Sequence, residues 1–199
     1  VPNETRQRIL KYELDIDKKL GFYAEFFVRH QICKELDIKN QEIVFSKNKD
    51  GKPYLKDYPG FHFNIAHTHN AIAVAFSVNE IGIDIEKVNV PEFKITKRFF
   101  TSSESDYIFS SKNPEYAFYE IWTKKEAYIK YIGTGLSTFL KSFNVLEDSL
   151  KNKITTWEQN GYIISVCCDD MIYEIPAKTL TERELLSLFF EVGWIKYLS

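Results

Sequence analysis

Asp84 and Glu86 are the first pair of residues whose types and spacing could do chemistry. They alternate with isoleucines in residues 81–86, IGIDIE, and such alternation is typical of a β-strand. Side chains two positions apart on a strand project from the same face, so both carboxylates can reach one cation. Oxygen ligands favour Mg²⁺, or Mn²⁺, over zinc. A solvated strand face would explain the same two residues, and the pair alone does not decide between these interpretations.

Glu126 and Lys130 form a second pair, in residues 122–130, WTKKEAYIK. Residues four apart share a face of a helix, and an ordinary surface ion pair would have this spacing. The functional alternative is a third carboxylate for the cation, with an ammonium group beside it. That combination suits a diphosphate substrate, because the cation and the ammonium together neutralise its charge.

Several other basic residues stand out. His67 ends an alternating segment, where its imidazole could donate to a phosphate oxygen. Lys52 lies in the turn-like sequence GKP of residues 51–53, and Lys18, Lys19 and Arg29 fall in a helical pattern. Solvent-exposed positions would explain these lysines and the arginine. A zinc site at the nearby histidines is disfavoured because no cysteine or fourth ligand accompanies them.

Composition excludes several classes of protein. The chain has 199 residues, a net charge of −2 and 44% hydrophobic residues, which indicates a globular fold and argues against a nucleic-acid binder. No apolar run is long enough to span a membrane. No Walker loop or Gly-x-Ser-x-Gly elbow is present, and no base is placed for Cys33. Three irregularly spaced cysteines predict reduced thiols and a cytoplasmic location.

The elements that must position these residues follow from periodicity and capping signals. We expect helix in the first third, then an antiparallel meander of strands at 61–66, 71–78 and 81–86. A long helix should begin at Asn113-Pro114 and end at Gly133, and a hairpin should turn at Asn160-Gly161. Shorter helices should begin at the capping boxes of Thr101 and Thr181. The proline-containing loop after residue 88 suggests halves at 1–88 and 89–199.

Five motifs follow one another along the chain: GKP at 51–53, FNIAH at 63–67, IGIDIE at 81–86, WTKKEA at 122–127 with Lys130, and GLS at 135–137. Their order and separation resemble the 4′-phosphopantetheinyl transferase superfamily, in its larger, pseudo-dimeric (Sfp-type) branch. The resemblance is clearest from about Arg29 to Ser142. It implies an α+β fold of two similar α/β halves, each a helix packed on antiparallel strands, in a pseudo-twofold arrangement with the active site in the cleft between them.

The resemblance also implies an activity. Such enzymes transfer the 4′-phosphopantetheine arm of coenzyme A to a serine of an apo acyl or peptidyl carrier protein and release adenosine 3′,5′-bisphosphate. Mg²⁺, or Mn²⁺, would sit on Asp84, Glu86 and Glu126, and Glu126 or a metal-bound water would take the serine proton. The implied coenzyme A contacts are Lys130 and His67 at the phosphates, Arg29 with Lys18 or Lys19 at the 3′-phosphate, and Lys52 at the adenine end.

This chain departs from the family at Ala66, where serine is common, and at Thr68-His69, where a Ser-Gly pair is common. Because the chain begins with Val1 and its only methionine is Met171, we expect a short leading segment to be missing. We expect a monomer that docks its carrier through residues 93–100, where basic and aromatic residues alternate. The rival functions are a non-catalytic domain that binds coenzyme A or a carrier, and a Mg²⁺-dependent nucleotide phosphohydrolase.

Overall fold

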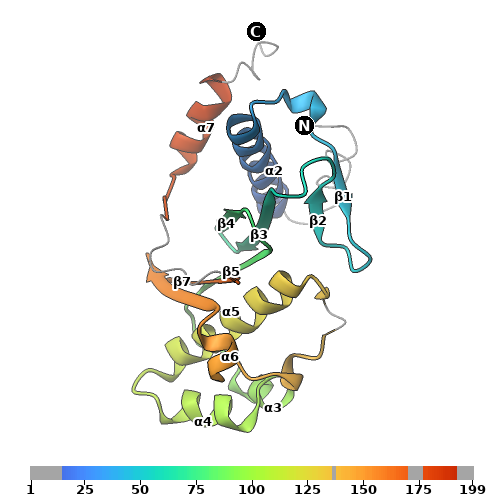
Figure 1. Cartoon of the computed structure of the whole chain (residues 1–199). Coiled ribbons are helices and arrows are strands. Elements are labelled where there is room, and N and C mark those ends of the chain that lie inside the picture. The colour runs from blue at the N-terminus through green and yellow to red at the C-terminus, as the bar shows by residue number, and fades with distance from the viewer. Residues whose placement is uncertain (1–14, 136–137, 170–176, 192–199) are drawn as a thin grey trace. The chain divides into compact units, whose positions relative to one another are not determined.

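The computed structural model describes residues 15–135, 138–169 and 177–191 (Figure 1). The chain divides into two compact units, one of residues 45–172 and the other of residues 1–44 with 173–199. Predicted helical residues before Asp15, and Leu136 and Ser137 of the GLS motif, lie outside the described residues.

The strands of the larger unit are all antiparallel. Strand β1 (Phe45–Lys47) pairs with β2 (Pro53–Leu55), and β3 (His62–Thr68) pairs with β4 (Ala71–Ser77). A separate sheet has the order β5-β7-β6, formed by β5 (Ile81–Lys87), β6 (Ile154–Gln159) and β7 (Tyr162–Cys168). Its β6–β7 turn contains Asn160 and Gly161 with φ values of 55° and 76°, as a tight hairpin requires.

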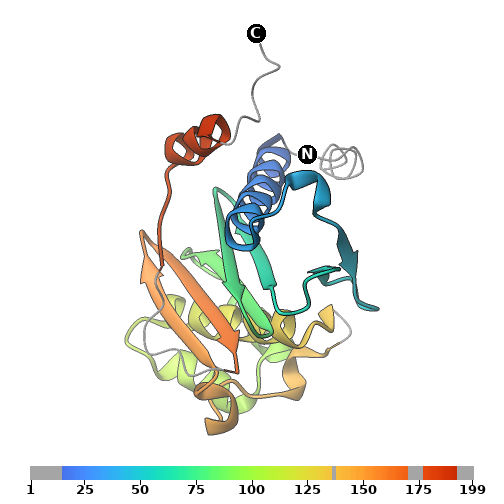
Figure 2. The same ribbon diagram turned by 45° about the horizontal axis from the view of Figure 1, so that its top comes forward.

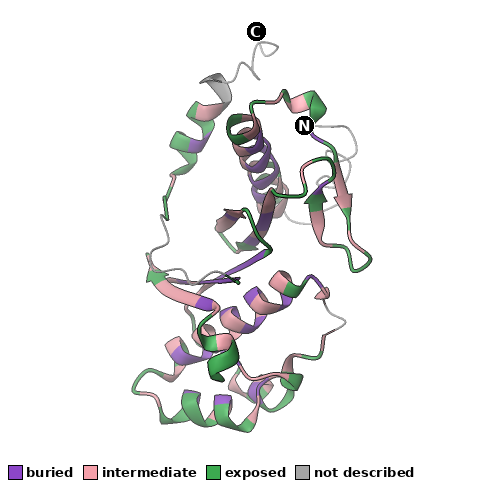
Figure 3. Cartoon of the chain, viewed as in Figure 1, coloured by how far each residue is buried: buried purple, intermediate pink, exposed green. Residues whose placement is uncertain are grey.

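Helix α5 (Pro114–Ile132) packs against β5 and β7, on one face of their sheet (Figure 2). Its predicted limits are confirmed. The Asn113 side chain accepts a hydrogen bond from the Tyr116 N–H, and Gly133 ends the helix with a φ of 70°. Strand β5 is buried over most of its length (Figure 3), so this contact forms the centre of the unit.

The remaining short helices of this unit are η2 (Phe93–Ile95), α3 (Thr96–Phe99), α4 (Ser102–Ser110), η4 (Leu140–Ser142) and α6 (Asp148–Lys151). Of these, α4 packs against α5, α3 against η2 and η4, and α6 against β6. The capping box predicted at Thr101 is present, and its Glu104 is fully buried. Glu104 Oε1 lies 2.8 Å from the buried Lys125 Nζ, which also donates to the Leu140 and Phe143 carbonyls. The ion pair joins α4 to α5, and the two carbonyl bonds join α5 to η4 and to the residue that follows it.

The smaller unit contains α2 (Asp15–Leu36), η1 (Asn40–Glu42) and α7 (Glu182–Glu191). Phe26 of α2 and Leu185 of α7 form its hydrophobic contact. At the surface, the Tyr23 hydroxyl donates to Glu182 Oε1 at 2.6 Å. The capping box predicted at Thr181 is present. The Thr181 N–H donates to Glu184 Oε2 at 2.7 Å, and the Glu184 N–H donates to Thr181 Oγ1 at 3.3 Å.

The predicted α+β class, with helices packed on antiparallel strands, is confirmed. The predicted meander is wrong in its last step, because β5 pairs with β7 rather than with β4. Strand alternation identifies a strand but not its partner, which here lies about 80 residues further along the chain. The pseudo-twofold arrangement and the boundary after residue 88 stay predictions. No helix among the described residues is both long and apolar enough to cross a bilayer.

Candidate active site

Strand β5 and helix α5 bring the predicted acidic residues and Lys130 into one cluster. Asp84 lies in the buried part of β5, and Lys130 lies in the last turn of α5. The Lys130 Nζ donates to Asp84 Oδ1 at 2.7 Å. Glu86 and Glu126 are close enough to Asp84 that its negative charge raises the pKa of each. Asp84 and Lys130, 46 positions apart, therefore form an ion pair, and the metal-binding role of the three carboxylates stays a prediction.

Gly82 allows this meeting. A Cβ atom added to Gly82 would lie 2.1 Å from the Ala127 carbonyl oxygen and 2.3 Å from the Tyr131 nitrogen. Both distances are far shorter than a van der Waals contact, so only glycine lets the α5 backbone approach β5 this closely. The close approach sets Glu126 and Lys130 opposite the acidic strand.

The three carboxylates repel one another and are partly dehydrated. Burial raises the pKa of Asp84 above its ordinary value, and the Lys130 ammonium only partly offsets that effect. Burial and the charge of Asp84 raise the pKa of Glu86 to about 6. Burial and Asp84 also raise the pKa of Glu126. Raised pKa values on three neighbouring acids are typical of a site that a cation neutralises.

Asp84 Oδ2 supports the same interpretation, because this buried oxygen has no hydrogen-bond partner among the residues that the structure describes. An unpaired buried carboxylate oxygen is costly unless a ligand completes it. In the described part of the chain, no three acidic, histidine or cysteine side chains already converge at metal-binding geometry. The donor types fit Mg²⁺, and closing the site around the ion requires side-chain adjustment of Glu86 and Glu126.

Strand β3 contributes residues whose roles the motif alone did not predict. The buried Asn64 accepts a hydrogen bond from the Ile83 N–H at 2.9 Å, which fixes β3 beside the residue preceding Asp84. The Thr68 hydroxyl donates to Glu86 Oε2 at 3.0 Å. Thr68 stood out in the sequence only as a departure from the family, and strand alternation could not show that it reaches Glu86. His67 is exposed, and its charge slightly lowers the pKa of Asp84.

Lys52, predicted at the adenine end, is bound by the protein itself. Its Nζ donates to Glu80 Oε2 at 2.6 Å and to the Ile81 and Tyr131 carbonyls, both at 3.1 Å. Beside it, a cavity of about 80 Å³ is lined by Asn48, Lys52, Pro53, Tyr54, His62, Phe63 and Glu80. The cavity is too small for a whole nucleotide, but it lies next to the predicted adenine contact.

Comparisons with known proteins match most of this sequence. A family model described as 4′-phosphopantetheinyl transferase superfamily matches residues 80–174, and one described as 4′-phosphopantetheinyl transferase, N-terminal, matches residues 1–79. The 4′-phosphopantetheinyl transferase gsp of Aneurinibacillus migulanus is 31% identical over 207 residues, covering 96% of this chain and 86% of the relative. This chain belongs to the 4′-phosphopantetheinyl transferase superfamily.

Further relatives agree with that assignment. The 4′-phosphopantetheinyl transferase Sfp of Bacillus subtilis (strain 168) is 36% identical over 198 residues, which cover 92% of this chain and 88% of the relative. The predicted Sfp-type branch is therefore confirmed. The holo-[acyl-carrier-protein] synthase of Thermotoga maritima overlaps 44% of this chain and 60% of its own, with a TM-score of 0.31 and 18% identity. That overlap is too partial to add to the assignment.

The other predicted coenzyme A contacts of this transferase lie on α2, in the smaller unit. Arg29 is buried, and its Nε donates to Glu25 Oε1 at 2.6 Å. Lys19 Nζ lies 2.6 Å from Glu182 Oε1, and Lys18 pairs with Asp15. Each of these cations therefore has an acidic partner within its own unit, and contact with coenzyme A would replace or share that partner.

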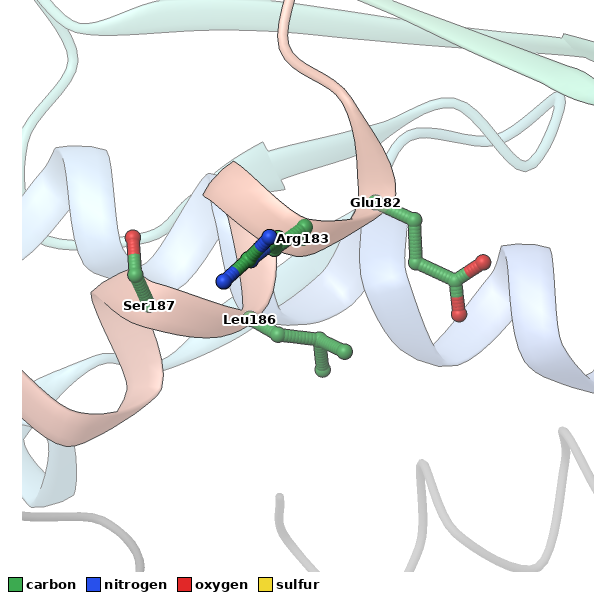
Figure 4. Close-up of a pocket in the computed structure, with 4 residues that line it drawn as sticks. All are labelled: Glu182, Arg183, Leu186 and Ser187. Atoms are coloured by element: carbon green, nitrogen blue, oxygen red, sulfur yellow. The ribbon is translucent and has the colours of Figure 1, made fainter.

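Two other features of the transferase lie outside the carboxylate cluster. A shallow cavity of about 500 Å³ beside α7 is lined by Glu182, Arg183, Leu186 and Ser187 (Figure 4). It contains none of the predicted catalytic residues. Cys167 is buried, and burial raises the pKa of its thiol to about 12, so this cysteine is a poor nucleophile.

Proposed function

We propose that this transferase uses Asp84, Glu86 and Glu126 to hold Mg²⁺ against the diphosphate of coenzyme A. Family membership gives the reaction itself, transfer of the 4′-phosphopantetheine arm to a carrier protein. The observation that supports the proposal is the ion pair of Lys130 with Asp84, whose other oxygen is buried without a partner among the described residues. Glu86 and Glu126 lie near enough for the charge of Asp84 to add to the effect of burial in raising the pKa of each. Bound Mg²⁺, or Mn²⁺, would supply positive charge that stabilises the phosphate oxygens of the transition state.

In the reaction, the carrier serine oxygen forms a bond to the phosphorus that bears the pantetheine arm. The bond from that phosphorus to the bridging oxygen breaks, and adenosine 3′,5′-bisphosphate leaves. Catalysis of such a transfer depends mainly on positioning and charge neutralisation. We assign Lys130 and His67 to the phosphate oxygens. Glu126 accepts the serine proton, directly or through a water that it orients.

The nucleotide of coenzyme A would occupy the other predicted contacts. The backbone at Lys52 and the adjacent cavity are our candidates for the adenine end. Arg29, with Lys19 or Lys18, is our candidate for the 3′-phosphate. A guanidinium suits that phosphate because it offers paired donors, and coenzyme A would compete with Glu25 for them.

We further propose that a carrier protein docks near residues 93–100, and that the enzyme acts as a cytoplasmic monomer. Lys94, Lys97 and Arg98 are exposed, which suits an acidic partner. Phe100 is only 1% exposed and packs in the core, so it is withdrawn from the predicted docking residues. The free Cys33, Cys167 and Cys168 are consistent with a reducing compartment.

Mass spectrometry of an apo carrier incubated with the enzyme, coenzyme A and Mg²⁺ tests the function. We expect the carrier to gain the mass of one phosphopantetheine. Release of inorganic phosphate without that gain would indicate a nucleotide phosphohydrolase, and coenzyme A binding without any reaction would indicate a binding domain.

The Asp84→Ala variant tests the metal assignment. We expect it to abolish transfer while circular dichroism shows a retained fold. Asp106→Ala, which removes an exposed carboxylate on α4, is the matched control and should keep full activity. Full transfer by Asp84→Ala would refute the assignment of this residue.

A further inference from the structure

Lys52 has an unusually complete set of partners for a lysine in a turn. Its side chain is only 14% exposed, and its three N–H donors reach Glu80 Oε2 and the carbonyls of Ile81 and Tyr131. An ammonium group has three donors, so no donor is left for a ligand while these bonds persist. All three hydrogen-bond donors of this ammonium group are therefore used by acceptors of the protein itself.

The two carbonyls identify what Lys52 holds together. Ile81 directly precedes Gly82, where the β5 backbone touches α5, and Tyr131 directly follows Lys130. The ammonium thus bridges the crossing of β5 and α5. Carbonyls at a helix C-terminus carry partial negative charge, and a cation there relieves it.

A second bond from the same turn supports this arrangement. The Asn48 side chain donates to the Gly133 carbonyl at 2.9 Å, and Asn48 also accepts the Lys52 N–H at 2.8 Å. The turn between β1 and β2 is therefore fastened at two points to the end of α5. A displacement of this turn would be transmitted to the helix that bears Glu126 and Lys130.

We propose that Lys52 is a positioning residue of this transferase, whose ammonium keeps β5 and α5 in the register that sets Lys130 and Glu126 opposite Asp84. The proposal rests on the function assigned above and gives the Lys52 side chain a different task from the adenine contact expected of it. The Lys52 backbone N–H and carbonyl are likewise bonded to Asn48, at 2.8 and 2.9 Å. Loss of the ammonium should impair the chemical step rather than the binding of coenzyme A.

The kinetic test compares Lys52→Met, which keeps the aliphatic stem, with Lys49→Met, which changes an exposed lysine of the same turn. We expect Lys52→Met to lower kcat about 10- to 100-fold at saturating coenzyme A and carrier, because small misplacement of catalytic groups has effects of that size. The KM for coenzyme A should change less than about threefold. Lys49→Met should match the wild type in both constants.

Lys52→Arg keeps the charge and is the second variant, in case Lys52→Met does not fold. A planar guanidinium cannot reproduce the three bonds of the ammonium, so we expect a smaller loss in kcat, again without a rise in KM. A raised KM with kcat unchanged, in either variant, would show that Lys52 contacts coenzyme A and would overturn the proposal.

Hydrogen exchange without substrates separates this proposal from the assigned function. The Gly133 N–H donates to the Ile129 carbonyl at 2.9 Å, so its exchange reports on the end of α5. We expect faster exchange at this amide in the Lys52 variants than in Lys49→Met. Unchanged exchange would overturn the proposal, whereas a wild-type enzyme that fails to transfer phosphopantetheine would overturn the assigned function alone.

Discussion

At the scale of single residues, the site is built at the expense of stability. Asp84, Glu86 and Glu126 are held together by the fold although their charges repel, and within this cluster the Lys130 ammonium is the compensating group. Such a cluster binds a cation well because binding relieves the repulsion. The protein without its metal should therefore become more stable when one of these charges is removed.

Glu86→Gln tests that expectation. The pKa of Glu86 is raised from 4.5 to about 6, so the folded protein binds this proton more tightly than the unfolded chain does. The contribution of Glu86 to stability is thus fully present below about pH 4.5 and is lost as the pH rises through 6. At pH 7.5 without Mg²⁺, we expect Glu86→Gln to unfold at a higher temperature than the wild type.

Added Mg²⁺ should reverse that order. The wild type should gain thermal stability from the ion, because ligand binding to the folded state shifts the unfolding equilibrium, and the variant should gain much less. Thermal unfolding followed by circular dichroism, with and without the ion, measures both effects. Equal stabilisation of both proteins by Mg²⁺ would remove Glu86 from the set of metal ligands.

At the scale of the elements, Gly82 decides how closely β5 and α5 pack. Gly82→Ala places a methyl group 2.1 Å from the Ala127 carbonyl oxygen, so the helix must move away from the strand. We expect a loss of about 3 kcal/mol in the free energy of unfolding, at the upper end of overpacking effects, together with loss of transfer. Urea denaturation and the carrier mass assay measure the two quantities.

Gly60→Ala is the matched control, because nothing lies within 4 Å of a Cβ atom added there. It should leave stability and transfer nearly unchanged. An active Gly82→Ala enzyme would mean that the carboxylate cluster tolerates separation of the two elements.

The buried ion pair of Glu104 and Lys125 gives a second prediction for the elements. Glu104→Ala leaves the ammonium of Lys125 buried with only two carbonyl partners, which should cost about 3–5 kcal/mol of unfolding free energy. Asp106→Ala on the same helix should have little effect. The double variant Glu104→Ala/Lys125→Met, which also removes the buried ammonium, should recover part of this loss in unfolding free energy. Chemical denaturation measures it, and a double variant no more stable than Glu104→Ala would show that the pair acts through more than its charges.

Local sequence signals predicted the limits of these elements well. They did not predict which strands pair when the strands are far apart in the sequence. Asn113, Gly133 and the Asn160-Gly161 turn act through neighbours within a few residues, so their sequence suffices. The pairing of β5 with β7 depends on the folding of the whole unit. The same holds for side-chain partners. The motif placed Lys52 near the site, but only the fold reveals that its ammonium holds two backbone carbonyls.

At the scale of the whole molecule, the enzyme must also recognise a protein partner. Its net charge of −2 gives no general attraction to an acidic carrier, so local positive charge must provide it. Lys97 and Arg98 are exposed on α3, whereas Phe99 and Phe100 pack toward the Trp122 side chain. The structure thus leaves the basic side chains of this segment available.

Charge reversal tests this docking site. Lys97→Glu combined with Arg98→Glu should raise the KM for the carrier about tenfold or more, with a steeper effect at low salt, while the KM for coenzyme A stays unchanged. Lys47→Glu combined with Lys56→Glu gives the same change in net charge at exposed positions elsewhere. Equal effects of the two double variants would place the carrier at another surface.

The two larger sheets of the catalytic unit adjoin through side chains, since β3 and β5 belong to different sheets and are joined by Asn64 to Ile83 and by Thr68 to Glu86. Because neither contact belongs to a strand ladder, loss of the Thr68 hydroxyl would release Glu86 from β3 and leave both ladders intact.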